Sequence, residues 1–305
     1  ICFALNIDYD NLVGQVKRTK INALLQYLNS RGRVGELTNW LEPQFPRENW
    51  SQFRAKTSPT SPYRGLQAFR QEHAPYYFGR ESFVTRLQEL VLRQTIIPII
   101  GPSGSGKSSV VFAGLLPHLQ NNPNWCIVTL RPGNAPFANL ALTLLPEYEN
   151  ELTETGRMVE SKRLALALRD GILQVADVAD QIAEKQPDKQ QFLLVIDQFE
   201  ELYTLSDAQT REIFLDQLIG FAETTQKFVP HVLYTLRADF MGQVLGYQPF
   251  VTLLNQHQDV KLSPLTEEEL RKVIEEPAKA AGATFAEGLV NRILEDVGQE
   301  PGNLP

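Results

Sequence analysis

Eight consecutive residues combine glycines, hydroxyls and a lysine at a spacing that suits phosphate binding. They read Gly101-Pro102-Ser103-Gly104-Ser105-Gly106-Lys107-Ser108 and fit G-x-x-x-x-G-K-[ST] at every fixed position. Glycines let the backbone curl so that its N–H groups point at phosphate oxygens. Lys107 supplies a point charge for the β- and γ-phosphates, and the Ser108 hydroxyl can ligate Mg²⁺. We expect ATP or ADP to be bound by Gly101, Ser103, Gly104, Ser105, Gly106, Lys107, Ser108 and Ser109.

A second candidate for chemistry is Asp197, which ends the apolar run at residues 192–196. A carboxylate at the carboxyl end of a strand can hold Mg²⁺ through water, although by itself it could equally be an acidic strand cap. The phosphate loop lies roughly one further βα unit upstream, and this favours the metal role. We therefore predict that Ser108 and Asp197 together hold Mg²⁺.

Three more side chains could act on a γ-phosphate. Glu200 and Glu201 follow the aspartate closely, and either could orient or activate the attacking water. In many P-loop ATPases the catalytic glutamate lies directly beside the aspartate, so the offset leaves the choice open, and a solvated acidic helix start is the alternative. Arg237 ends another apolar run and should face the nucleotide, where it could stabilise the γ-phosphate. The alternative for Arg237 is a local ion pair with Asp239.

These side chains require elements that bring them to one edge, and the sequence predicts a sheet of that kind. Short apolar runs alternate with helical patterns, which indicates an α/β fold with a parallel sheet covered on both faces. A further helix should start at Thr266, where Thr-Glu-Glu-Glu forms a capping signal. The expected strands are 95–100, 126–130, 192–196, 232–236 and 260–262, and the expected helices include 81–93, 161–184 and 208–221.

Composition narrows the possible partners and compartments. The 305 residues suit about two domains, and the net charge of -7 gives no reason to expect nucleic acid or a membrane surface as a partner. Cys2 and Cys126 are far apart and fit neither a disulfide framework nor a zinc site, so we expect a reducing, cytoplasmic location. No metal or triad spacing links the four histidines. Because the chain opens at Ile1 and stops at Pro305, we expect it to be a piece of a longer protein.

The chain divides into four predicted segments. Residues 1–45 have helical apolar spacing, and residues 46–75 include a Pro/Ser/Thr-rich stretch typical of a linker. Residues 76–262 carry the α/β pattern, and residues 263–305 begin a further helical region.

Three segments resemble the bacterial "novel STAND" NTPases. They are PYRGLQAF at residues 62–69, YFGRE at 77–81 and LVIDQFEEL at 194–202. The resemblance covers about residues 62–305 and implies a P-loop NTPase fold of the ASCE/STAND type. The helices after the sheet would then be the start of a lid domain.

The resemblance also implies contacts with the base and sugar of the nucleotide. Phe78, Gly79 and Arg80 match a hydrophobic-Gly-Arg motif that packs near adenine and ribose in STAND proteins. Residues 302–305 are similar to a Gly-x-Pro motif whose proline touches adenine, with one extra residue between glycine and proline here. Pro305 would be that proline.

Residues 1–45 resemble a bacterial effector-associated domain with a death-domain-like helical fold. Features of the match include the segments LNIDYDNL and LLQYL leading to Arg31-Gly32-Arg33. The resemblance implies an adaptor that recruits an effector protein or domain. A plain helical dimerisation or capping unit is the alternative.

Together these features predict an ATP/ADP-operated signalling switch, with slow ATP hydrolysis and homo-oligomerisation in the ATP state. Defence, regulated death and transcriptional control all suit such a switch. An AAA+-like remodelling motor and a nucleotide-bound scaffold without hydrolysis are the alternatives. A small-molecule kinase is the least favoured, because nothing resembles an acceptor pocket.

Overall fold

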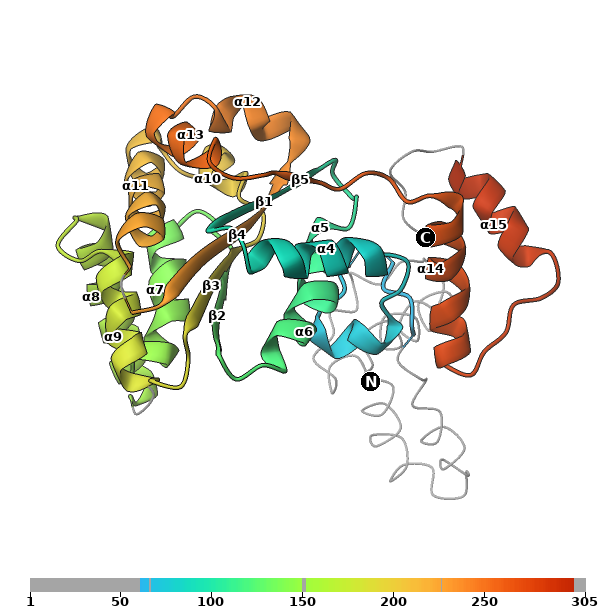
Figure 1. Ribbon diagram of the computed structural model, residues 1–305, viewed down its shortest axis with the longest axis horizontal. Helices are drawn as coiled ribbons and strands as arrows, with labels where there is room; N and C mark the ends of the chain where they lie inside the picture. Colours follow the sequence, from blue (N-terminus) through green and yellow to red (C-terminus); the bar gives the residue numbers. More distant parts are fainter. Residues whose placement is uncertain (1–60, 66, 150–151, 226, 299–305) are drawn as a thin grey trace, which may run out of the picture. The chain divides into compact units, whose positions relative to one another are not determined.

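The computed structural model describes residues 61–65, 67–149, 152–225 and 227–298 (Figure 1). The chain divides into two compact units, residues 1–63 and 64–305, and nearly all of the described residues belong to the second. The predicted helical unit at 1–45, most of the predicted linker and Pro305 lie outside the described residues.

A five-stranded parallel sheet forms the centre of the second unit, and this confirms the predicted α/β fold. The strand order is β2-β3-β4-β1-β5, so β4 lies between β1, which precedes the phosphate loop, and β3, which precedes Asp197. In this register Gly101 pairs with Arg237, which brings the ends of β1 and β4 together. The strands are β1 (Ile96–Gly101), β2 (Trp125–Leu130), β3 (Gln191–Ile196), β4 (Val229–Arg237) and β5 (Val260–Lys261).

Helices cover both faces of the sheet, and alternate strand residues point to each face (Figure 1). On β3, Phe192, Leu194 and Ile196 join the core beneath α7, α9 and α11, whereas Leu193 and Val195 join the core beneath α4, η2 and α6. Burial on both faces explains why the strands read as continuous apolar runs. The helices of these two layers are α4 (Glu81–Val91), η2 (Val110–Leu115), α6 (Leu116–Gln120), α7 (Pro136–Tyr148), α8 (Glu154–Arg169), α9 (Val175–Lys185) and α11 (Ala208–Thr224).

The helix predicted over 161–184 is two helices, α8 and α9. The chain breaks after α8, where Gly171 adopts a left-handed φ of 70°. The buried amide of Gln217, from α11, donates to the carbonyls of Leu168 and Leu173, and its oxygen accepts the N–H of Val175. This side chain therefore satisfies the backbone groups that the break exposes.

The compact unit begins at Arg64, whereas residue 76 is the predicted start of the α/β region. A 3₁₀ helix, η1 (Gln71–Tyr76), precedes α4. Phe69 contacts the rings of His73 and Tyr77, with centroids 6.1 and 5.8 Å away. These aromatic contacts make the end of the predicted linker part of the folded unit.

Beyond the sheet, α14 (Glu267–Ala280) and α15 (Leu289–Gly298) pack together (Figure 1). The predicted start of α14 is confirmed: Thr266 Oγ1 accepts the Glu269 N–H, and the Glu269 carboxylate accepts the Thr266 N–H at 2.8 Å. Short helices α10 (Glu201–Thr204), η3 (Ala238–Phe240), α12 (Met241–Val244) and α13 (Gln248–Leu254) connect the later strands.

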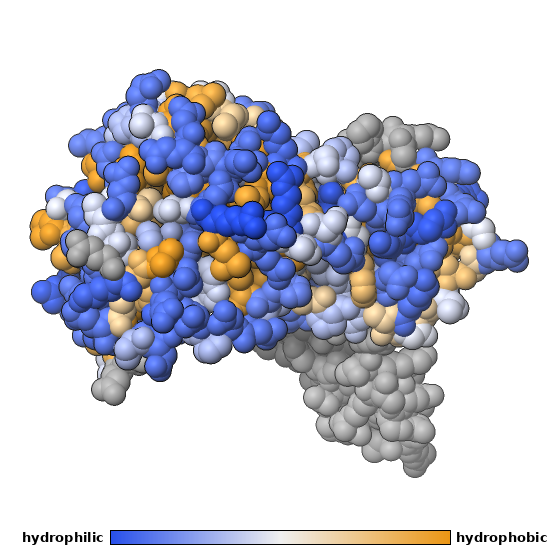
Figure 2. All heavy atoms as spheres, viewed as in Figure 1, coloured by the Kyte–Doolittle hydropathy of each residue, from blue (hydrophilic) through white to orange (hydrophobic). Residues whose placement is uncertain are grey.

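Hydrophilic side chains cover most of the surface seen in Figure 2, and hydrophobic residues appear there in small separate groups. Within the described ranges, none of the helices combines the length and apolar character needed to cross a membrane.

Candidate nucleotide-binding site

The phosphate loop leaves β1 at Gly101 and turns directly into a helix. Gly106 is the residue before that helix, α5 (Lys107–Ser109), and has a left-handed φ of 86° that a side chain would disfavour. The helix continues as the wider π-helical turn η2, whose residues are all buried. The loop is thus fixed between a buried strand and a buried helix, as the sequence context predicts.

Lys107 is a nearly buried cation held against its own loop. The residue is 9% exposed, and Nζ donates to the carbonyl oxygens of Gly101 at 3.0 Å and Pro102 at 2.6 Å. Burial lowers the pKa of Lys107, and the carboxylate of Glu200 acts in the opposite direction. A largely desolvated ammonium that donates only to two neutral carbonyls is well placed to gain from an anionic phosphate.

Ser108 and Asp197 meet directly, and Thr235 joins them. The Ser108 hydroxyl donates to Asp197 Oδ1 at 2.7 Å, and the Thr235 hydroxyl donates to the same oxygen at 2.8 Å. Asp197 is only 5% exposed. Thr235 lies outside the set of site residues predicted from the sequence, although a polar residue within the apolar run of β4 is a signal that could have identified it.

This set of oxygens suits Mg²⁺. Magnesium in phosphate sites is usually held by one or two protein oxygens, with water and phosphate completing the octahedron. Ser108 and Asp197 provide a hydroxyl and a carboxylate at hydrogen-bond distance. Across the described segments there is no cluster of three or more His, Cys, Asp or Glu side chains that could bind a metal on its own.

The two candidate glutamates have different surroundings. Glu200 lines the same cleft as Lys107, and its carboxylate accepts the Arg237 N–H at 3.3 Å. Glu201 instead accepts from Arg131 Nε at 2.6 Å and from the Gly133 N–H at 2.9 Å. Its hydrogen bond is the main cause of the raised pKa of Arg131. The geometry therefore favours Glu200 for contact with a nucleotide and gives Glu201 a structural role at the end of β2.

The surroundings of Arg237 are compatible with both of its interpretations, contact with a nucleotide and a local ion pair with Asp239. It lines the cleft beside the phosphate loop, and its guanidinium also forms a bidentate ion pair with Asp239 at 3.1 and 2.6 Å. The hydrogen bond from Arg237 lowers the pKa of Asp239. Both side chains are substantially exposed, so the pair contributes little stability and Arg237 can leave it at low cost.

These residues surround a cleft of about 420 Å³. One wall of the cleft comes from the segment PYRGLQAF, which precedes η1. The Ser109 hydroxyl accepts the N–H of Phe69 at 3.1 Å and holds this segment beside the loop. The lining residues are Gly65, Gln67, Ala68, Ser103, Gly104, Gly106, Lys107, Ser108, Ser109, Gln198, Glu200, Thr235 and Arg237.

Gly79 and Arg80 do not line this cleft; they contact α14. A Cβ added to Gly79, which has a φ of 85°, would lie 2.6 Å from Val273 Cγ2 and 2.7 Å from the Glu269 carbonyl oxygen. Arg80 is 6% exposed and donates to the Ser263 carbonyl at 2.7 Å, with Glu269 at 3.8 Å. Burial lowers the pKa of Arg80.

Phe78, in the same motif, is half-buried. The adenine contact implied for Phe78, Gly79 and Arg80 stays a prediction. Pro305 lies outside the described residues.

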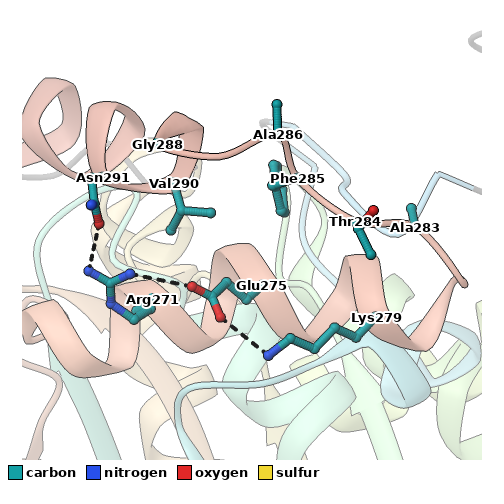
Figure 3. A pocket seen from close by; sticks show the side chains of 10 residues that line it. All are labelled: Arg271, Glu275, Lys279, Ala283, Thr284, Phe285, Ala286, Gly288, Val290 and Asn291. Carbon is teal, nitrogen blue, oxygen red and sulfur yellow. Dashed lines mark hydrogen bonds and ion pairs between the residues drawn. The ribbon is translucent and has the colours of Figure 1, made fainter.

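A second hollow, of about 320 Å³, lies between α14 and α15 (Figure 3). Its charged side chains are already paired: Glu275 accepts from Arg271 at 3.4 Å and from Lys279 at 3.2 Å, and Arg271 also donates to Asn291 at 3.0 Å. It shares no residue with the phosphate loop. We therefore interpret this hollow as part of the packing between the two helices.

Strand β4 lies between β1, which leads into the phosphate loop, and β3, which leads into Asp197, and polar side chains gather at the carboxyl ends of these strands. This arrangement defines a P-loop NTPase. The chain belongs to the novel STAND NTPase 1 family, whose model matches residues 62–305. Residues 1–46 match effector-associated domain 7. These matches confirm the predicted STAND-type NTPase with an N-terminal effector-associated domain, and the P-loop fold implies nucleotide binding.

Solved structures with a similar fold include the Walker-type ATPase PABY2304 of Pyrococcus abyssi and the ORC1 protein of Aeropyrum pernix, determined in complex with DNA. The first is 13% identical with a TM-score of 0.50, and the alignment covers 75% of this chain and 65% of that one. The second is 15% identical with a TM-score of 0.50, and the alignment covers 75% and 57%. The chain thus spans less than two thirds of either relative, and the likeness shows the fold alone. No curated protein matches the sequence.

Proposed function

We propose that this chain is an adenine-nucleotide-operated switch in which the nucleotide sets the position of α14. The observation that carries the proposal is the contact of Gly79 and Arg80 with α14. These two residues lie at the start of the NTPase core, and α14 follows its last strand. The contact therefore joins the nucleotide-binding core to the first helix of the lid.

A nucleotide can move such a helix only if it binds two arrangements with different affinities. Lys107 and Arg237 supply a source of that difference, because both line the cleft and both carry charge that suits a γ-phosphate. ATP offers this group and ADP does not. The exposed ion pair between Arg237 and Asp239 leaves Arg237 able to change partners.

Slow hydrolysis would return the switch to its ADP state. Ser108 and Asp197 would hold Mg²⁺, which neutralises charge on the phosphates when it is bound. Glu200 lies in the cleft and would accept a proton from the attacking water. Glu201 takes no part, because Arg131 and Gly133 already bind its carboxylate.

The output would pass through the N-terminal segment. The match of residues 1–46 to an effector-associated domain supports recruitment of an effector protein or domain. Oligomerisation in the ATP state would bring several of these domains together.

The nucleotide retained by the purified protein tests this proposal. Nucleotide is released by heat and separated by chromatography, and steady-state ATP turnover is measured on the same preparation. We expect ADP with turnover near background. An empty site with rapid turnover would indicate a motor, and a guanine nucleotide would contradict the adenine assignment. A single-turnover measurement distinguishes slow hydrolysis, which we expect, from the complete absence of hydrolysis that would indicate a scaffold.

A further inference from the structure

The backbone is strained next to Asp197. Among the described residues other than glycine, Gln198 is the one with a positive φ, at 59°. A glutamine in the left-handed region costs free energy relative to glycine or asparagine. Such a conformation persists when its surroundings enforce it, and it points to a functional constraint.

Neighbouring contacts hold Gln198 in this conformation. Its N–H donates to the Thr235 hydroxyl at 2.8 Å, and the N–H of Phe199 donates to the Thr235 carbonyl at 2.9 Å. The Phe199 ring is fully buried and stacks on Tyr234 with centroids 4.4 Å apart. The turn after Asp197 is therefore fixed on both sides of Gln198.

The strained turn places Gln198 in the nucleotide cleft. Gln198 lines that cleft together with Lys107, Ser108 and Glu200. Within the described part of the chain, its side-chain amide forms no hydrogen bond, whereas the hydroxyls of Ser108 and Thr235 are both engaged by Asp197. An amide offers both a donor and an acceptor, so it can hold a water molecule in one orientation.

We propose that the Gln198 side chain orients the water that attacks the γ-phosphorus of bound ATP, an inference that rests on the proposed function. The water oxygen forms a bond to the γ-phosphorus while the bond from that phosphorus to the bridging oxygen breaks. ADP leaves with the electron pair, and the water proton passes to the Glu200 carboxylate. Because an amide cannot accept this proton, Gln198 contributes orientation and not basicity.

Two substitutions separate the side chain from the strained backbone. Gln198→Gly removes the amide and fits the left-handed conformation, so the fold should be retained. Gln198→Glu keeps a polar group at the same distance. Gln209→Ala, on the exposed surface of α11, is the matched control. The affinities for ADP and Mg-ATP, the melting temperature and the single-turnover rate of ATP hydrolysis are measured for each variant.

For Gln198→Gly we expect unchanged affinity and a melting temperature no lower than that of the wild type, with a rate at least about tenfold lower. Gln198→Glu should retain more activity than Gln198→Gly, and Gln209→Ala should match the wild type. Equal loss in both Gln198 variants, or loss of affinity together with rate, would overturn the inference. So would a wild-type protein that binds ATP without hydrolysing it.

The same measurements distinguish failure of the inference about Gln198 from failure of the proposed function. If Gln198→Gly hydrolyses ATP at the wild-type rate while Lys107→Ala abolishes nucleotide binding, the role of Gln198 is wrong and the proposed function stands. If the wild-type protein binds no adenine nucleotide, the proposed function itself is wrong.

Discussion

The Ser108 hydroxyl donates to Asp197 Oδ1 at 2.7 Å, although the two residues are 89 positions apart in the chain. Ser108 follows β1 and Asp197 follows β3, and these strands flank β4 in the sheet. Because the carboxyl ends of parallel strands share one edge, the topology alone brings the two oxygens together. Neither side chain needs a long loop to reach the other.

This pair predicts how binding depends on magnesium. Ser108→Ala and Asp197→Asn each remove one proposed Mg²⁺ ligand, so both should reduce the difference in ATP affinity between magnesium and EDTA by about tenfold or more. Calorimetric titration measures this difference. The control is Ser161→Ala, which removes a buried serine hydroxyl in α8, away from the cleft. Wild-type magnesium dependence in Asp197→Asn would contradict the assignment.

Lys107→Met tests whether the buried Lys107 charge lowers the stability of the fold and binds the phosphates of the nucleotide. Methionine has similar length and no charge to bury, so the nucleotide-free variant should melt at the same temperature as the wild type or higher. ADP should raise the melting temperature of the wild type and leave that of the variant unchanged. Thermal unfolding with and without ADP gives both results. A variant that ADP still stabilises would show that Lys107 does not bind phosphate.

The lowered pKa of Lys107 adds a pH dependence. Between this lowered value and the unfolded value of 10.5, the unfolded state binds more protons at this group. The contribution of Lys107 to folding stability therefore rises with pH in that window. We therefore expect the stability advantage of Lys107→Met over the wild type to shrink as the pH approaches 10.5. Urea unfolding of both proteins at several pH values measures this difference in the free energy of unfolding.

Gly79→Ala tests the contact between the core and α14. The added Cβ would meet Val273 and the Glu269 backbone at less than 3 Å, in addition to the strain of a φ of 85°. We expect a loss of about 1 to 3 kcal/mol in the free energy of unfolding. Gly171→Ala is the matched control, because Gly171 has a φ of 70° and nothing within 4 Å of an added Cβ. Equal losses in the two variants would mean that α14 shifts away from the added Cβ at no cost in the free energy of unfolding.

Glu200 and Glu201 should respond oppositely to the same substitution. Glu200→Gln should slow hydrolysis by about a hundredfold with an unchanged melting temperature. Glu201→Gln should lower stability by about 1 to 3 kcal/mol, because it weakens the hydrogen bonds to Arg131 and Gly133. Single-turnover hydrolysis and urea unfolding of both variants distinguish the roles. The reverse pattern would assign the catalytic role to Glu201.

Local patterns predict the strands, the phosphate loop and Asp197, because buried parallel strands and phosphate loops carry strong signals in consecutive residues. The same patterns cannot separate Glu200 from Glu201. That distinction depends on Arg131 and Gly133, which follow a different strand and lie close only after the sheet has formed.

Contacts between distant segments account for the other differences. Arg80 meets Ser263 across 183 positions of the chain, so no local motif reveals that it supports α14. The break between α8 and α9 has a local cause as well, because Gly171 adopts the left-handed conformation that commonly ends a helix, and Gln217 from α11 adds a tertiary contact that stabilises the break. The role of Arg80 thus depends on tertiary contacts, whereas Gly171 marks the helix break in the sequence.

We propose that the bound nucleotide changes the position of α14 relative to the sheet. Spin labels are attached at Gln209 on α11 and Lys272 on α14, which are both exposed. Double electron–electron resonance then measures the distance between the two labels. Cys2 is replaced, and Cys126 is buried with its pKa raised to about 12, so it should not be labelled. We expect different distance distributions with ADP and with Mg-ATP in Glu200→Gln protein. Identical distributions, in a protein shown to bind both nucleotides, would contradict it.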